Sequence, residues 1–228
     1  MSKVSANLQT PVNNGLSRRG TLVCQTVSWL LVVVVCTLAI TTWGQYNAWR
    51  LGSLNTYQIF PVLGLLAFSI MWTHYITGTM RRLLNIDKSA FFCYFNVTGW
   101  IVLLLICLHP GLLMYQRFRD GYGLPPHSYE TYVRPGLGWV TLVGSVSLLA
   151  FLAYELRRFY SSRPWWHYLQ IATDLAMVAI FYHALRLGDE LQTGWFVKVW
   201  WFYGVTLGAV LIYDYNRKYI QPWLKPKV

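Results

Sequence analysis

The sequence predicts an all-α integral membrane protein, a bundle of six transmembrane helices with both termini on the cytoplasmic side of the bilayer. Two of the supporting observations are compositional: hydrophobic residues make up 55% of the 228 residues, and charged residues only 12%. A soluble domain carries about twice that charged fraction. The third observation is that six apolar runs recur along the chain, each long enough to cross a hydrocarbon core of about 30 Å as a helix.

The first three helices follow a polar tail, residues 1–20, that is rich in Ser and Asn. The apolar run at 21–43 is long for the apolar region of a secretory signal, and no small-x-small cleavage site accompanies it, so we expect a helix that remains in the protein. Residues 57–78 and 89–115 give the second and third helices, separated by a short basic loop.

The last three helices follow the one long loop, residues 117–135, which contains several Gly and Pro residues. The fourth helix is expected at 136–159. The fifth begins near Pro164, a residue favoured in a first helical turn, and ends near Gly188, a common C-terminal stop. The sixth spans 194–215. The expected organisation is a polar tail, a six-helix domain and a short basic tail, at 1–20, 21–216 and 217–228.

Basic residues set the expected orientation, because Lys and Arg gather on the cytoplasmic side of a membrane. Of the 19 Lys and Arg residues, 13 lie in the two terminal segments and in the loops after the second and fourth helices. The other six flank the opposite helix ends, so both termini are expected in the cytoplasm. The formal charge of +11 has the same origin. We expect no nucleic-acid partner, because no basic patch has a folded module of its own.

Four of the five histidines, His74, His109, His167 and His183, fall within the expected helices. An ionisable side chain inside a membrane is costly and is a functional candidate by default, and neutral imidazole is the usual axial ligand of membrane haem. The alternating helix directions place His74 and His167 near the inner side, and His109 and His183 near the outer side. The four residues therefore form an inner and an outer pair.

The two histidines of the fifth helix cannot serve one pair of helices in a simple way. His167 and His183 are sixteen residues apart, which is about 24 Å along a helix and a rotation of about 160°. They face nearly opposite sides, so two haems held between the same helices would need a kink or different partner helices.

Several motifs resemble those of one family. The first stretches are Gly64-Leu65-Leu66-Ala67, the segment from Gly78 through Arg81-Arg82 to Asp87, and Leu108-His109-Pro110. The later ones are Leu156-Arg157-Arg158, Trp165-Trp166 and the segment from Tyr182-His183 to Gly188. Together, residues 60–215 resemble the ferric reductase-like transmembrane domain, whose superfamily includes NADPH oxidases, ferric reductases and the bacterial membrane subunit of methionine sulfoxide reductase.

The resemblance implies a haem-binding bundle in which the third and fifth helices each carry an inner and an outer haem ligand. His109 and His183 match the outer ligands. Phe95, 14 residues before His109, and Gln170, 13 residues before His183, stand where the family has its inner histidines. Neither residue is an ordinary haem ligand. The resemblance therefore favours an outer haem and leaves the usual inner haem without its ligands.

The inner space still carries polar residues. His167, Gln170 and Asp174 share one face of the fifth helix by their spacing, and His74 and Asn96 are expected to face the same space. Asp174 lies deep in the membrane and needs a partner or a proton. Three interpretations remain open: His74 and His167 ligate a relocated inner haem, the space holds a quinone, a flavin or a proton relay, or the residues make only polar contacts between helices.

We therefore expect a b-type cytochrome, with one haem or two, that passes electrons between a cytoplasmic or quinol donor and an outer-face acceptor. No G-x-G-x-x-G motif follows a strand, and the flavin- and nicotinamide-binding domain of larger family members is expected to be missing. A separate reductase or a quinol would then supply electrons, with other subunits of a membrane complex as further partners, in a bacterial inner membrane. One alternative is a membrane anchor or quinone-reactive subunit of a larger oxidoreductase. The other is a haem-free transporter or assembly scaffold.

Overall fold

The computed structural model describes residues 18–221 except 51, 53, 156–161 and 193. The described residues form helices and no strand, which confirms the all-α prediction. Six helices are long, namely α1 (Arg18–Tyr46), α2 (Thr56–Leu83), α3 (Phe92–Arg119), α5 (Gly138–Glu155), α7 (Trp166–Leu187) and α8 (Phe196–Tyr215). Four short turns accompany them, η2 (Lys88–Phe91), α4 (His127–Glu130), η3 (Asp189–Leu191) and η4 (Asn216–Ile220).

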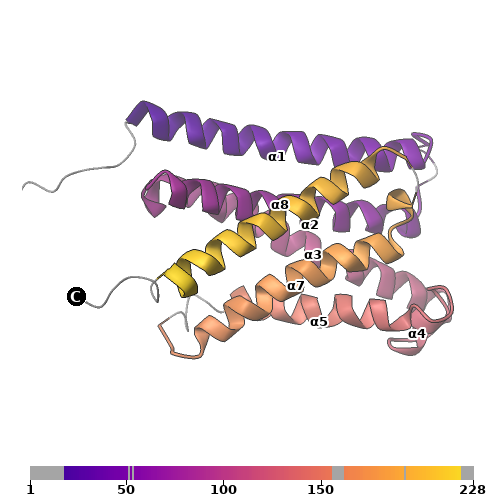
Figure 1. Cartoon of the computed structure of the whole chain (residues 1–228). Helices are drawn as coiled ribbons and strands as arrows, with labels where there is room; N and C mark the ends of the chain where they lie inside the picture. Colours follow the sequence, from indigo (N-terminus) through magenta and orange to yellow (C-terminus); the bar gives the residue numbers. More distant parts are fainter. Residues whose placement is uncertain (1–17, 51, 53, 156–161, 193, 222–228) are drawn as a thin grey trace, which may run out of the picture.

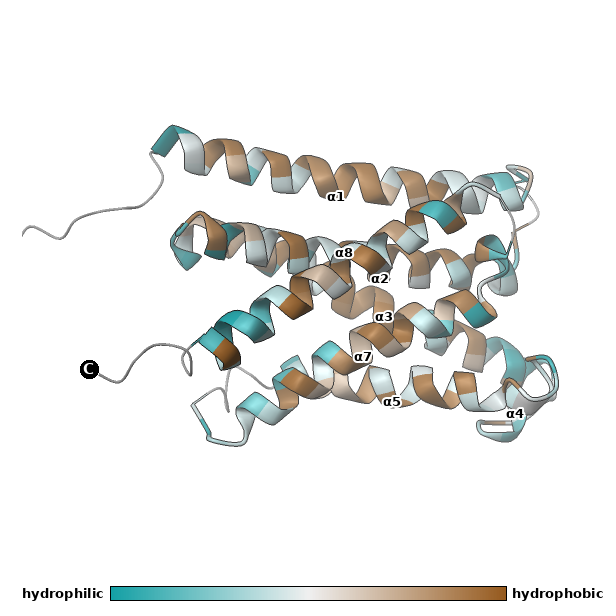
Figure 2. Ribbon diagram, in the orientation of Figure 1, coloured by the Kyte–Doolittle hydropathy of each residue, from teal (hydrophilic) through white to brown (hydrophobic). Residues whose placement is uncertain are grey.

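Each of the six long helices is long and apolar enough to cross a membrane. Apolar side chains cover their outward faces: Leu104, Leu149 and Leu175 are each at least 60% exposed. Such a surface suits lipid, and it would be a liability in water. Figure 2 shows the same division, with hydrophobic residues along the middle of the helices and hydrophilic residues gathered toward their ends. The chain is a multi-pass membrane protein.

Two helix pairs organise the bundle. Helix α2 packs mainly against α3 and α1 and also contacts α8, while α5 packs mainly against α7. The start of α1 and the end of α8 lie at one end of the bundle, and α4 lies at the other (Figure 1). We call these the terminus end and the α4 end. An even number of spans brings both described ends to one side, as expected, while the assignment of that side to the cytoplasm remains a prediction.

The helix boundaries differ from the predicted ones in a few places. The fifth span begins at Trp166, after Pro164, and ends at the Gly188 cap as predicted. The fourth was expected to reach residue 159, and 156–161 lie outside the described residues. The one-turn helix α4 inside the long loop was not predicted, because four residues are too few to show a periodic pattern.

The two tails also start at other positions than expected. Helix α1 begins at Arg18, inside the expected 1–20 tail, and residues 1–17 lie outside the described part. At the other end the π-helical turn η4 extends α8 into the expected 217–228 tail, of which 222–228 are not described.

Aromatic side chains join the two helix pairs at the middle of the bundle. Phe68 of α2 lies 4.4 Å from Trp200 of α8, and Trp72 lies 4.5 Å from Tyr203, measured between ring centroids. Phe181 of α7 stacks parallel to Trp200 at 6.1 Å. Helix α8 can approach α7 this closely because it has a glycine, Gly204, facing Phe181.

A methyl group at Gly204 has no room. A Cβ built there lies 2.4 Å from Cζ of Phe181, whereas a Cβ at Gly208, one turn later, meets nothing within 4 Å. We expect Gly204→Ala to destabilise the protein by about 1–3 kcal/mol through overpacking. Gly208→Ala is the matched control and should be neutral or stabilising by up to about 1 kcal/mol, because alanine favours a helix. Unfolding of the purified protein in detergent measures both, and equal effects of the two variants would contradict this packing account.

Candidate functional site

His109 of α3 is held by the backbone of α2. Its Nδ1 lies 2.7 Å from the carbonyl oxygen of Phe60. One turn further along α2 is Gly64, and a Cβ built there would lie 2.8 Å from Cε1 and 2.9 Å from Nδ1 of the imidazole. The ring can reach the carbonyl only because residue 64 has no side chain.

His183 of α7 is held by α5 in the same way. Its Nδ1 lies 2.9 Å from the carbonyl oxygen of Val140. One turn further along α5 is Gly144, where a Cβ would lie 2.7 Å from Cε1 and 2.9 Å from Nδ1 of His183. Each of the two main helix pairs therefore contains one imidazole, one carbonyl and, four residues after the carbonyl, one glycine. We call this arrangement the imidazole cradle.

The cradle fixes the tautomer of each histidine. A carbonyl oxygen only accepts hydrogen bonds, so Nδ1 must carry the hydrogen and Nε2 must present its lone pair. Neither Nε2 has a hydrogen-bond partner among the described residues. The chain thus builds two neutral imidazoles that are oriented through one nitrogen and available for ligation through the other.

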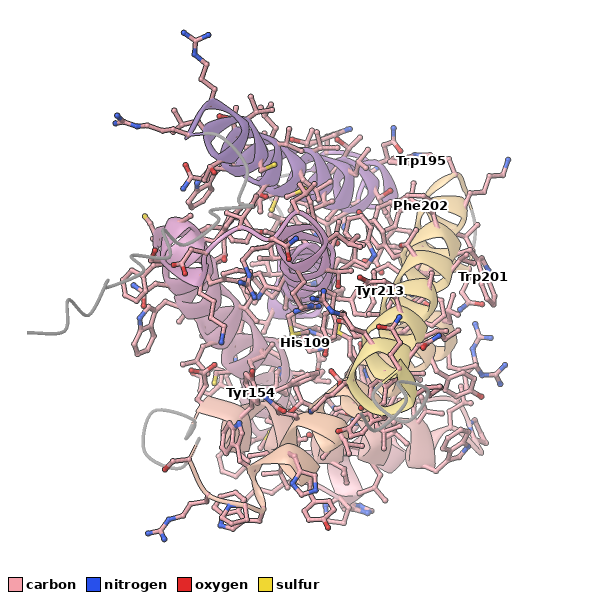
Figure 3. All side chains as sticks on the ribbon, turned by 60° about the vertical axis from the view of Figure 1, so that its left-hand side comes forward. His109, Tyr154, Trp195, Trp201, Phe202 and Tyr213 are labelled. Atoms are coloured by element: carbon pink, nitrogen blue, oxygen red, sulfur yellow. The ribbon has the colours of Figure 1, made fainter. Side chains whose placement is uncertain are left out.

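The two cradles lie at one depth. Phe60 is near the start of α2 and Val140 is near the start of α5, so both histidines lie toward the α4 end. The imidazoles are close enough to interact electrostatically, and each keeps part of its surface accessible. Figure 3 places His109 in the middle of the bundle. This is the outer pair of the sequence analysis, and the structure brings its two members together.

A haem fits this donor set. Two neutral imidazoles from separate helix pairs, each held by a backbone carbonyl, are the kind of donor that bis-histidine ligation of a haem iron uses. The described residues contain no group of three or more His, Cys, Asp or Glu side chains that could hold a metal ion.

The structure does not bring the inner pair together in the same way. Nε2 of His74 lies 2.6 Å from the Thr98 hydroxyl, whose own hydrogen goes to the Tyr94 carbonyl, so His74 is the donor of a bond between α2 and α3. Nδ1 of His167 lies 2.6 Å from the carbonyl of Pro164, in the turn that precedes its own helix. His74 lines the cavity described next, and His167 is not among its lining residues.

A cavity of about 860 Å³ opens at the terminus end between α2, α3, α5, α7 and α8. Phe95 and Gln170, the two residues that the resemblance aligns with inner ligands, both line it, and so does Asp174. Asn96 was expected to face this space, but its side chain is exposed and does not line the cavity, because it lies about 100° around α3 from Phe95.

Asp174 has the partners that its depth demands. The Tyr75 hydroxyl donates to Oδ1 at 2.8 Å and the Tyr215 hydroxyl donates to Oδ2 at 3.0 Å. These bonds tie α7 to α2 and α8. Closer to the terminus end, Arg82 of α2 pairs with Asp214 of α8. Other basic residues line the cavity mouth, namely Arg81, Lys88, Arg217 and Lys218.

The α4 end carries a second polar group, around Arg117 of α3. The Tyr57 hydroxyl donates to Asp120 Oδ2 at 2.6 Å, and Tyr57 stacks on Tyr132 with ring centroids 6.0 Å apart. Burial raises the pKa of Glu190 in the nearby turn η3, and burial with neighbouring carboxylates raises the pKa of the Tyr132 phenol to about 12.

Sequence reasoning named the histidines but missed the other parts of the cradles. The structure repeats one arrangement in two helix pairs, which the sequence analysis does not predict. The sequence signal is slight: one glycine in each of the second and fourth spans, placed so that a histidine on the next span reaches the carbonyl one turn earlier. This spacing can be recognised as part of a site only when it is known which helices pack against each other.

Comparison of the chain with models of known families, with curated proteins and with solved structures finds no match.

Proposed function

We propose that the chain is a b-type cytochrome of the membrane that passes electrons across the bilayer. The observation that carries this proposal is the pair of imidazole cradles, which present two Nε2 lone pairs at one depth. The site contains no nucleophile with an adjacent base, and transfer of electrons needs none. A bound haem b would supply the one-electron iron couple; the protein supplies ligands, orientation and low dielectric.

The residues of the site have distinct tasks in this proposal. His109 and His183 would be the axial ligands. The Phe60 and Val140 carbonyls hold each ring in place, and a hydrogen bond to Nδ1–H makes the imidazole a more basic ligand. The lipid-facing leucines and valines keep water from the site. The electron donor would be a separate cytoplasmic reductase or a quinol, and the acceptor would lie at the α4 end.

The distribution of charge supports the orientation proposed for the bundle in the membrane. The basic segments gather at the terminus end, which the positive-inside rule assigns to the cytoplasm. The α4 end would then face outward, and the cradles would lie in the outer half of the bilayer, within a bacterial inner membrane. The resemblance to the ferric reductase-like domain agrees with this arrangement and remains part of the proposal.

A second candidate function rests on the cavity at the terminus end. Its size suits a ligand of drug-like dimensions, and it combines an apolar depth with the hydrogen-bonded carboxylate of Asp174. A quinone, or a flavin, would fit such a lining, and the chain would then be the quinone-reactive membrane subunit of a larger oxidoreductase. A relocated inner haem would occupy the same cavity with His74 as its only lining histidine.

The haem proposal predicts a coloured protein. The purified protein should show the sharp reduced band of haem b, and His109→Ala and His183→Ala should each abolish the outer haem, because each removes one of two axial ligands. His127→Ala, in the α4 turn, is the control and should leave the spectrum unchanged. The ratio of haem to protein in wild type and in His74→Ala tells one haem from two. A colourless wild-type protein would leave the haem-free transporter or scaffold as the function.

The cradles predict that a side chain at either glycine weakens haem binding. Gly64→Ala and Gly144→Ala should each weaken haem binding by about 10- to 100-fold, the range seen when support of a metal ligand is lost, because a methyl group displaces the imidazole. Gly111→Ala is the control on α3, where a Cβ meets nothing within 4 Å. Haem retention during titration with a competing apo-haem protein measures the three variants. An equal loss in Gly111→Ala would show that the effect is not specific to the cradles.

The cavity can be tested separately. If a quinol donates electrons there, a quinone analogue should inhibit haem reduction by quinol, and Asp174→Asn should slow that reduction because the carboxylate can no longer accept a proton. Reduction by dithionite, which needs no quinone site, should be unaffected in the same variant. Reduction by quinol at the wild-type rate in Asp174→Asn would exclude this role of the carboxylate.

A further inference from the structure

Arg117 is a buried cation near the α4 end of α3. Its side chain is only 5% exposed, and its Nε is buried with no hydrogen-bond partner among the described residues. One Nη2 bond goes to the hydroxyl of Thr131. The guanidinium lies 3.5 Å from the ring centroid of Tyr122 and 5.6 Å from that of Tyr132.

No carboxylate forms an ion pair with Arg117 among the side chains that the structure describes. Asp120 is already held at both oxygens, by Tyr57 at 2.6 Å and by Gln116 at 2.8 Å. Glu190 is buried, and this burial raises the pKa of its carboxyl group. Asp189 is exposed. Within the described part of the chain the one ion pair joins Arg82 and Asp214, at the other end of the bundle.

A buried guanidinium without an anion is costly. A charge taken out of water needs a paired charge and satisfied hydrogen bonds, and stacking on aromatic rings contributes only about 0.5–2 kcal/mol. The surroundings of Arg117 thus form an incomplete anion site, with the cation, its aromatic walls and a spare N–H in place. The planar fork of arginine suits a carboxylate.

The anion site adjoins the first cradle. Tyr132, which lies under the guanidinium, meets Phe60 edge-on with centroids 6.0 Å apart, and Phe60 packs on His109 at 5.3 Å. Arg117 is eight residues beyond His109 on α3, which is about 12 Å toward the α4 end. The cation is therefore displaced from the ligand nitrogen along the helix axis and toward the outer side.

We propose that Arg117 binds a carboxylate of the haem that His109 ligates, that is, one of the two propionates on a single edge of the macrocycle. This inference rests on the proposed function. The propionate edge would face the α4 end, and Arg117 would fix the haem about its axis as a positioning residue. The Arg117 charge also favours the reduced iron, which carries one positive charge fewer than the oxidised iron.

The test is a redox titration of Arg117→Met with its haem bound. Without the arginine the propionate charge is uncompensated and favours oxidised iron, so the equilibrium constant for reduction should fall about tenfold, which is about 59 mV for a one-electron couple. The propionate should also hold its proton more tightly, so the midpoint potential should become dependent on pH near neutrality. Arg117→Lys keeps the charge and should restore most of the potential. If Arg117→Met does not retain haem, Arg117→Gln, which also removes the charge, carries the same measurement.

Three controls test whether the effect is specific to Arg117 and whether its partner is a haem carboxylate. Arg119→Met removes an exposed cation two residues away on α3 and should leave the potential and its pH dependence unchanged. Glu130→Gln removes the acidic residue next to Thr131 in the sequence; if it raises the midpoint potential by as much as Arg117→Met lowers it, Arg117 pairs with the protein and the inference is wrong. A wild-type potential that follows the concentration of added acetate or phosphate would assign the site to a soluble anion and also overturn it. A haem-containing Arg117→Met with wild-type potential refutes this inference alone, whereas a protein without haem refutes the proposed function.

Discussion

The hydrogen bond from an imidazole Nδ1–H to a helical carbonyl is the interaction on which the candidate site depends. That carbonyl already belongs to the backbone ladder of its helix and accepts a second bond through its other lone pair. The imidazole can approach only where the next turn presents no Cβ, at Gly64 and Gly144. One absent side chain in each helix pair therefore sets the tautomer, the ring plane and the depth of a candidate ligand. No charged residue is needed, which suits a site surrounded by lipid.

The two ends of the bundle differ in their chemistry. Toward the α4 end the site is built from neutral imidazoles, tyrosines and one buried guanidinium. At the terminus end a cavity is lined by Asp174, by four tyrosines that include its two hydrogen-bond donors, and by several cations. The bonds from Tyr75 and Tyr215 to Asp174, together with the Arg82–Asp214 pair, also hold α2, α7 and α8 together where the aromatic packing of the middle ends. Polar groups here support both the fold and a second candidate site.

The positions expected to hold inner haem ligands are occupied by other side chains. Phe95 and Gln170 line the cavity as the resemblance implies for inner ligands, yet neither side chain ligates iron readily. His74 sits on the same wall but donates to Thr98. His167 makes its bond within its own first turn. The bundle therefore has a cavity at this depth, lined by His74, Gln170 and Asp174 among other residues, without His167.

The sequence by itself determined the six spans, their apolar surfaces and the depth of each histidine. Insertion of a segment into a bilayer depends on the length, hydrophobicity and flanking charge of that segment, and these are local properties. The sequence also marked Asp174 as a residue that needs a partner. Only the tertiary structure decided that Gly64 lies under His109 and Gly144 under His183, that Tyr75 and Tyr215 hold Asp174, and that Arg117 is buried. These are contacts between helices far apart in the chain. Which faces meet depends on the packing of whole helices, a property that no single span encodes.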